Sequence, residues 1–299
     1  MRDSVALVIS DRRPFAEGIA FGDTGAYERL TGRARFAVDP RASRNRDVVD
    51  LEKAPMTGDG LVEFAADFMI LKPVDLTRAN RRLFFDYGNR GHKRALQFFN
   101  DAHPGNDPLT QDHAGNGFLM RRGYTVAWLA WEGDLLPGSG RMVIDLPVAT
   151  DHGRPITGLV RVEYIADQPG VTTLPLSGRI AARSYPAVSL DTGRVRLTRR
   201  RYPYDERIPL PSDAWCFART EGGRGGEVGE AERAIIPSDQ HIHLYGGFEP
   251  GWIYELVYTA RDPLVHGLGH VAVRDFVSFL RHATAGNPVP GLEQAYAWG

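Results

Sequence analysis

The sequence feature that most constrains the fold is a continuous apolar run at residues 124–131. A strand with one face in water alternates apolar and polar side chains, and this run lacks that alternation. Such a run is typical of a strand buried on both faces, as in a parallel sheet covered by helices. We therefore expect residues 124–131 to form a central strand of an α/β sheet.

The residues before this run predict one strand and two helices, which lead into the strand at 124–131. Residues 83–87 form a short apolar run that glycines interrupt, and residues 117–123 suit a short helix with a glycine stop. Between them, residues 93–100 have helical spacing and would bury Ala95, Leu96, Phe98 and Phe99. This order is typical of a βαβ unit in an α/β fold.

The remaining chain divides into regions of different pattern. Strand-like runs at 5–9, 27–38 and 62–71 predict an N-terminal β-meander. Five further runs with hairpin spacing predict a β-rich insertion, at 142–148, 159–165, 194–197, 214–218 and 241–245. We expect four regions: an N-terminal β-region at 1–80, the first α/β core segment at 81–140, the insertion at 141–248 and a return to the core at 249–299.

The return to the core is predicted from three segments. Residues 251–258 suit a strand, and residues 268–282 suit a helix whose apolar side chains recur on one face. After a Pro and Gly turn, residues 295–299 begin a last strand. If that strand lies at an unpaired sheet edge, we expect the chain to aggregate or to bind hydrophobic dyes.

Charge and cysteine content narrow the function classes. The formal net charge is -1, from 36 basic and 37 acidic residues, so no overall field attracts nucleic acid or an anionic membrane. The single cysteine, Cys216, excludes an internal disulfide and a cysteine-rich zinc site. No apolar run reaches the length of a membrane span and no leader pattern precedes the first strand, so we expect a cytoplasmic protein that binds small molecules.

Five segments together resemble the bacterial "alpha/beta hydrolase domain" family of large serine hydrolases: residues 25–32, 89–91, 117–134, 251–281 and 295–299. The resemblance implies a partial α/β-hydrolase sheet with an N-terminal β-meander and a large β-rich insertion. It also implies that Gly299 is the first glycine of the Gly-x-Ser-x-Gly nucleophile turn. No serine of this sequence lies in that motif, and the acid and histidine follow the serine in this fold.

The resemblance therefore implies the N-terminal part of a serine hydrolase, without its nucleophile and inactive by itself. The intact protein would cleave a small-molecule carboxylic ester, or less readily an amide, through an acyl-enzyme and without a cofactor. What this chain would supply is half of an oxyanion hole, from the loop after the third sheet strand. The candidate donors are Asn89, Arg90 and Gly91, and the pattern leaves open which one donates. It also leaves open that the loop is only a tight strand-to-helix turn with no catalytic role.

Other polar residues have competing interpretations. Glu132 and Asp134 follow the buried strand, where α/β folds bind ligands, but loop solubility or an ion pair explains them as well. The pairs His241 with His243 and His266 with His270 have spacings that suit a metal, yet no third ligand accompanies either pair. We expect no metal site there.

Two segments of the insertion carry further expectations. The basic stretch 198–201 suits a solvated strand face rather than a nucleic-acid site, and the glycine-rich stretch 221–227 suits a loop. A different function class also remains open, a non-catalytic binding module that uses the insertion as its recognition surface.

Overall fold

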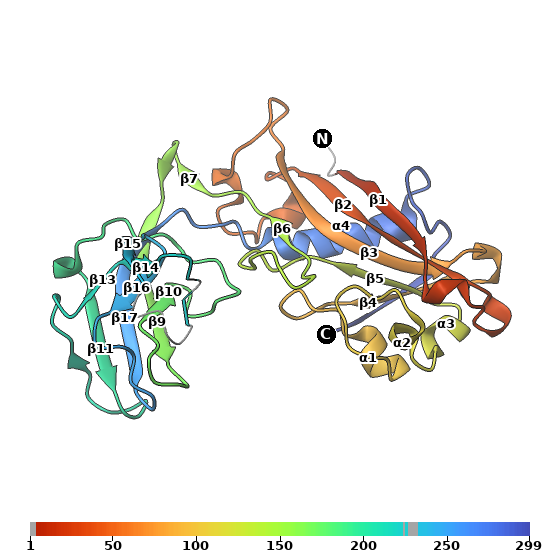
Figure 1. Cartoon of the computed structure of the whole chain (residues 1–299). Coiled ribbons are helices and arrows are strands. Elements are labelled where there is room, and N and C mark those ends of the chain that lie inside the picture. Colours follow the sequence, from red (N-terminus) through yellow and green to blue (C-terminus); the bar gives the residue numbers. More distant parts are fainter. Residues whose placement is uncertain (1–3, 224, 227–232) are drawn as a thin grey trace. The chain divides into compact units, whose positions relative to one another are not determined.

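The computed structural model describes residues 4–223, 225–226 and 233–299, so Arg224 and Glu227 of the expected glycine-rich loop lie outside the described residues. The chain forms two compact units (Figure 1). The core unit comprises Met1–Val148 and Leu264–Gly299, and the inserted unit comprises Ala149–Pro263. The sequence pattern placed the insertion at 141–248, so the inserted unit begins and ends later than that expectation.

The core unit is built on one mixed sheet. Its elements, in chain order, are β1 (Ser4–Pro14), β2 (Tyr27–Val38), β3 (Val62–Pro73), β4 (Arg82–Asp86), α1 (Ala95–Asn100), α2 (Gln111–Ala114), α3 (Phe118–Arg121), β5 (Thr125–Leu129), β6 (Ile144–Asp145), α4 (Leu268–His282) and β18 (Gln294–Trp298). Five single-turn 3₁₀ helices connect them, at Ala16–Gly18, Gly22–Thr24, Ser43–Asn45, Leu51–Lys53 and Leu76–Arg78.

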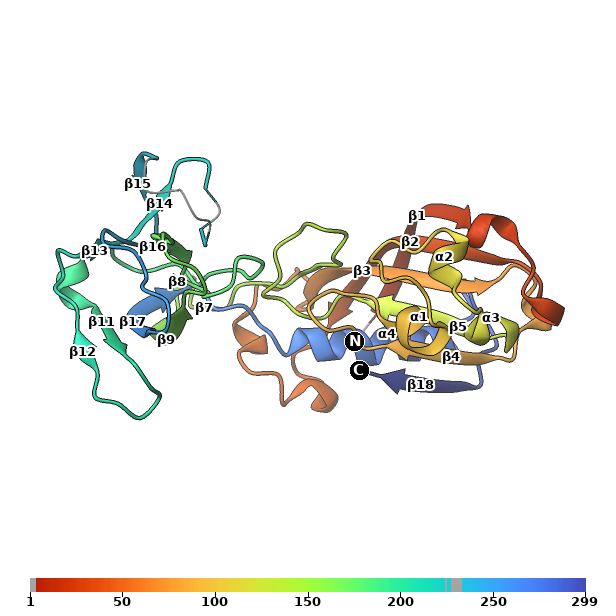
Figure 2. The same ribbon diagram turned by 60° about the horizontal axis from the view of Figure 1, so that its bottom comes forward.

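The seven-stranded sheet has the order β1-β2-β3-β5-β4-β18, with β6 paired to β3. Along this order, the neighbours β1, β2, β3 and β5 pair antiparallel. The neighbours β5, β4 and β18 pair parallel. All five residues of β5 are buried, as its unbroken apolar pattern predicted. The chain thus runs from β4 to β5 on one side and later returns to pair β18 on the other side of β4 (Figure 2).

Helices cover both faces of the parallel strands. Successive side chains of a strand point to opposite faces. Phe84 of β4 packs against Phe99 of α1, with ring centroids 4.7 Å apart, whereas Phe85 packs against Phe276 of α4 at 6.4 Å. Helices α1 and α4 therefore lie on opposite faces of the sheet. The connection from β4 to β5 and the connection from β5 to β18 run in opposite directions along the strand order, and two right-handed crossovers of opposite direction place their helices on opposite faces.

The last strand forms one edge of this sheet. Strand β18 pairs with β4 from Gln294 opposite Arg82 to Trp298 opposite Asp86, and it is the end of the strand order. Its side chains are mostly exposed, Tyr296 among them. The expected parallel strand is therefore present, and one side of it has no strand partner among the described residues.

The inserted unit consists of short antiparallel strands. They are β7 (Thr150–Asp151), β8 (Arg154–Pro155), β9 (Thr157–Ile165), β10 (Thr173–Pro175), β11 (Arg196–Arg200), β12 (Ile208–Pro209), β13 (Trp215–Cys216), β14 (Ala218–Thr220), β15 (Ile235–Pro237), β16 (His241–Leu244) and β17 (Ile253–Arg261), with one 3₁₀ helix at Thr192–Arg194. Their sheets have the orders β12-β11-β17-β9, β10-β16-β13, β14-β15 and β7-β8.

Strand β17 lies in the inserted unit and not in the core, where the sequence pattern had placed residues 251–258. It pairs antiparallel with β9 along nine residues and with β11. Tyr254, Leu256 and Tyr258 of β17 join Trp215 in the apolar core of this unit. An apolar strand pattern alone does not distinguish these partners from a neighbour in the parallel sheet, which is why the boundary was misplaced.

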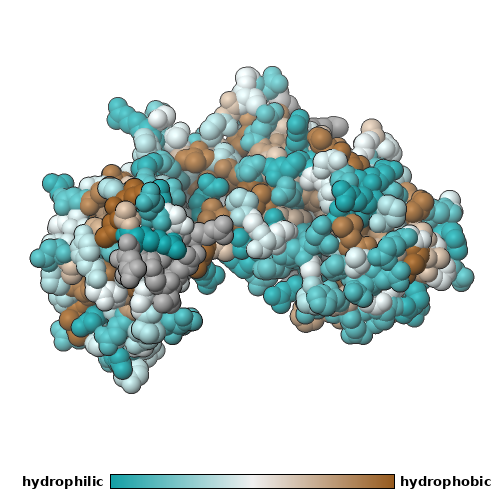
Figure 3. All heavy atoms as spheres, in the orientation of Figure 1, coloured by the Kyte–Doolittle hydropathy of each residue, from teal (hydrophilic) through white to brown (hydrophobic). Residues whose placement is uncertain are grey.

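Two local expectations were also wrong. Phe98 of α1 is 56% exposed instead of buried, because this helix has only six residues and turns that side chain outward. Of the expected strand 142–148, only Ile144–Asp145 forms a strand and Val148 forms an isolated bridge with Leu264. The N–H of Val143 donates to the Asp67 carboxylate instead of to a main-chain carbonyl of a neighbouring strand. On the face that Figure 3 shows, apolar residues are dispersed among hydrophilic ones.

Candidate functional site

The carboxyl ends of β4, β5 and β18 meet at the point where the strand order reverses. In open α/β sheets this switch point is where ligands bind, in the crevice outside the strand ends. The N–H of Tyr87 donates to the carbonyl of Trp298 at 2.7 Å. Gly299 lies so close to the same segment that a Cβ on it would be 2.9 Å from the carbonyl oxygen of Tyr87. The end of β18 therefore adjoins the loop that follows β4.

Asp86 anchors the beginning of that loop. Its Oδ2 accepts hydrogen bonds from the N–H groups of Arg94 and Ala95, both at 2.8 Å, and from Nε1 of Trp128 at 2.5 Å. Burial raises the pKa of Asp86, and these hydrogen bonds partly oppose the rise. Its other oxygen, Oδ1, has no hydrogen-bond partner among the described residues. One carboxylate thus ties β4 to the start of α1 and to β5.

The loop between Asp86 and α1 is tightly curved. A Cβ on Gly88 would lie 2.4 Å from the carbonyl oxygen of His92, so only glycine fits there. The Gly88 carbonyl accepts a hydrogen bond from Nε1 of Trp131 at 2.7 Å. Arg90 and Gly91 both have positive φ, 55° and 73°. This geometry is more constrained than that of an ordinary surface loop and fixes the direction of its N–H groups.

The candidate oxyanion donors and the candidate ligand-binding acids contact each other. The Arg90 guanidinium donates to both oxygens of Asp134, at 3.1 and 2.9 Å, and lies 3.7 Å from Glu132. Burial raises the pKa of Glu132, while the Arg90 charge and the N–H groups of Arg90 and Gly91 lower it. Two of the three candidate N–H donors therefore lie close enough to Glu132 to lower its pKa. Asn89 is exposed.

The sequence reasoning missed an aromatic cluster at the same edge. The hydroxyl of Tyr87 and Nδ1 of His270 lie 2.6 Å apart in one hydrogen bond. The Trp131 ring lies beside both, with centroids 5.0 Å from Tyr87 and 5.3 Å from His270. Gly269 lets α4 approach, since a Cβ there would be 2.0 Å from the Trp131 carbonyl oxygen. The position of Tyr87 and Trp131 directly after two parallel strands could have identified them.

The two histidine pairs differ in their surroundings. His266 precedes α4, which begins at Leu268, so it does not share a helical face with His270. In the inserted unit, Nδ1 of His243 is 2.9 Å from the Thr173 hydroxyl, and burial lowers the pKa of His243. Among the described residues, no three His, Cys, Asp or Glu side chains are placed to hold a metal ion.

The longest described helix, α4, has 15 residues, and within the described ranges no helix has the length and apolarity to cross a membrane.

Neither a protein-family model nor a curated protein nor a solved structure matches this chain.

Proposed function

We propose that this chain forms the N-terminal part of a serine α/β-hydrolase that cleaves a carboxylic ester, or less readily an amide, through an acyl-enzyme. The nucleophilic serine would follow Gly299. One observation carries the proposal: β18 runs parallel to β4 and ends beside the loop after β4, at the reversal of strand order. A nucleophile turn needs this placement, because it projects a hydroxyl from a strand end toward N–H donors of a neighbouring loop.

The proposed role of the loop follows from the charge that acyl transfer creates. Attack of a serine on an ester carbonyl produces an oxyanion, and N–H groups fixed in direction before the reaction stabilise it. Gly88, Arg90 and Gly91 hold the loop in a single tight conformation. Since the N–H groups of Arg90 and Gly91 lie close enough to Glu132 to lower its pKa, we assign the donor role to the N–H of Asn89, a residue that is exposed.

The ion pairs around Arg90 would serve this loop rather than a ligand. Arg90 compensates the charges of Glu132 and Asp134, two carboxylates that would otherwise repel a developing oxyanion nearby. Glu132 and Asp134 are thus proposed as positioning residues. The sequence pattern also allows a role for these two acids in ligand binding. That role would require the ligand to displace the Arg90 guanidinium.

The test uses a form of the protein that extends past Gly299, with a chromogenic ester as substrate. Asn89→Pro removes the proposed N–H donor, and Asn89→Ala removes only the side chain. We expect Asn89→Pro to lower kcat about 100- to 1,000-fold, the usual effect of losing one oxyanion donor, and Asn89→Ala to lower it less than about threefold. Equal kcat values for the two variants would contradict the assignment of Asn89.

A binding module is the second candidate function, and one cavity favours it. The inserted unit contains a cavity of about 560 Å³, lined by Pro209, Leu210, Phe248 and Tyr254 among others. A cavity of this size and composition suits a small apolar ligand. If the extended form shows no esterase activity and no reaction with a fluorophosphonate, this second function replaces the first.

A further inference from the structure

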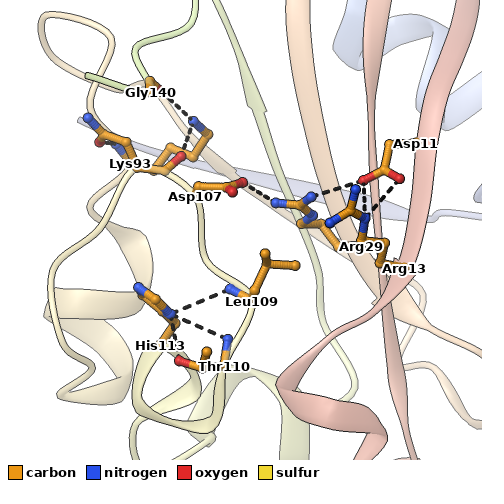
Figure 4. Close-up of polar contacts among 10 residues, drawn as sticks. Asp11, Arg13, Arg29, Lys93, Asp107, Leu109, Thr110, His113 and Gly140 are labelled. Atoms are coloured by element: carbon orange, nitrogen blue, oxygen red, sulfur yellow. Dashed lines mark hydrogen bonds and ion pairs between the residues drawn. The ribbon is translucent and has the colours of Figure 1, made fainter. Parts of the chain in front are cut away.

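A cavity of about 460 Å³ in the core unit collects positively charged groups that the proposed hydrolase does not use. It lies over β1, β2 and β3 and is bordered by the loops around residues 106 and 140. Its lining includes Thr31, Arg33, Asp67, Lys93, Asp107 and Arg141. Figure 4 shows the side of this region where Lys93 and Asp107 lie.

Lys93 is unlike the other lysines of the chain. The sequence has three lysines, and the remaining 33 of its 36 basic residues are arginines. Lys53 is paired with Asp50 at 2.8 Å and Lys72 with Glu28 at 2.7 Å. Within the described ranges Lys93 forms no ion pair; its Nζ donates to the main-chain oxygens of Asn106 at 2.7 Å and Gly140 at 3.5 Å (Figure 4).

Lys93 is nevertheless buried, with 7% of its surface exposed. Burial lowers its pKa to about 8, although the charges of Asp107 and Asp67 oppose this effect. Those two carboxylates are engaged elsewhere, since Asp107 pairs with Arg29 and Asp67 pairs with Arg33. The Lys93 ammonium is therefore only partly compensated by the protein.

Arg141 provides a second uncompensated cation in the same lining. Its Nε is buried and has no hydrogen-bond partner, and its guanidinium forms no ion pair with any described residue. A buried donor without an acceptor costs about 1–3 kcal/mol, more when it carries charge. Lys93 therefore has only main-chain acceptors, and neither cation has the anionic partner among the described residues that a charge removed from water normally has.

We propose that this cavity binds an anionic oxygen group, a carboxylate or a phosphate, through Lys93 and Arg141. One ligand oxygen would accept from the Lys93 ammonium, and another would accept from the guanidinium of Arg141, whose planar shape suits both groups. The carbonyls of Asn106 and Gly140 hold Lys93 in place for this contact. The assignment does not depend on the hydrolase proposal, because it involves no nucleophile.

The test measures how anions protect Lys93 from acylation in the 299-residue chain. An amine-reactive ester is applied in chloride, in inorganic phosphate or in acetate at equal ionic strength, and the lysines are followed by peptide mass spectrometry. At ten times its dissociation constant, the bound anion slows acylation of Lys93 about tenfold. Exposed Lys53, which lies outside the cavity, serves as the internal control and keeps its rate.

Two variants complete the test. Arg141→Gln should abolish the protection while Lys93 remains present, and Lys93→Met should abolish the rise in Tm that phosphate or acetate gives the unmodified chain. Protection by phosphate alone, by acetate alone or by both supports the site and identifies its ligand class. If neither anion slows acylation nor raises Tm more than it does in the variants, or if Arg141→Gln keeps the protection, the proposal is overturned.

Discussion

The buried carboxylate of Glu255 in β17 allows a stability prediction of defined size. Only 2% of Glu255 is exposed, on the face of its sheet opposite the apolar core. Arg207 donates to it at 2.8 and 3.0 Å, Arg161 at 2.8 Å and Arg200 at 3.0 Å. The perturbation is Glu255→Gln, which keeps the shape of the side chain and removes the charge.

The magnitude follows from the pKa of Glu255. Its hydrogen bonds with Arg207, then Arg161 and Arg200, lower the pKa from 4.5 to about 2 against the opposing effect of burial. Since a tenfold change in acidity is worth about 1.4 kcal/mol, the corresponding stabilisation is at most about 3.5 kcal/mol. Arg161 and Arg207 are partly exposed, so solvent screening reduces our expectation to about 2 kcal/mol.

The pH dependence has a definite sign. A carboxyl whose folded pKa is lowered stabilises the fold fully above its ordinary pKa, and the stabilisation is lost as the pH falls through the folded value. Glu255 should therefore contribute fully above about pH 4.5 and lose its contribution between pH 4.5 and pH 2. The Glu255→Gln variant and the unmodified chain should converge in stability at the acid end.

Urea unfolding from pH 7 to pH 2.5, followed by hydrogen exchange of β9 and β17 amides, measures this difference in the inserted unit. The matched control is Glu249→Gln, because Glu249 is exposed and contacts Arg199 only at 3.5 Å. We expect the control to change stability by less than about 0.5 kcal/mol. A Glu255→Gln deficit that is absent at pH 7, or that stays constant down to pH 2.5, would refute the reasoning.

Two predictions concern the candidate site. Because burial raises the pKa of Asp86, the unmodified chain loses stability as the pH rises above the ordinary pKa of a carboxyl group. The variant Asp86→Asn has no carboxyl group there and avoids that loss. Its free energy of unfolding in urea, relative to that of the unmodified chain, should therefore improve between pH 4 and pH 7. Gly88→Ala places a Cβ against the His92 carbonyl and should cost about 2 kcal/mol and loosen the loop amides in hydrogen exchange, whereas Gly158→Ala, with open space around it, should not.

The sheet centre could be predicted because its signal is local. The unbroken apolar run of β5 suits a strand buried on both faces, and the last strand comes directly after a turn. The pairing partners of each strand could not be predicted in this way, since an apolar pattern does not specify which strand lies alongside. Strand β17 was therefore placed in the core, although its nine-residue register with β9 holds it in the inserted unit.

The candidate site was predictable only in part, for a similar reason. Glycines and the strand end locate the loop after β4, but the contact of Arg90 with Glu132 and Asp134 joins segments about 40 residues apart. The hydrogen bond between Tyr87 and His270 joins residues still farther apart in the sequence. Such contacts arise from sheet topology, and no spacing in the sequence encodes them.

The central claim is that β18 leads into a nucleophilic serine at the switch point. The most direct test treats a form of the protein that extends past Gly299 with a fluorophosphonate and maps the adduct by peptide mass spectrometry. We expect a single adduct on a serine within a few residues after Gly299, and no labelling of the 299-residue chain. An adduct on any serine of residues 1–299, or none at all in a folded extended form, would contradict the claim.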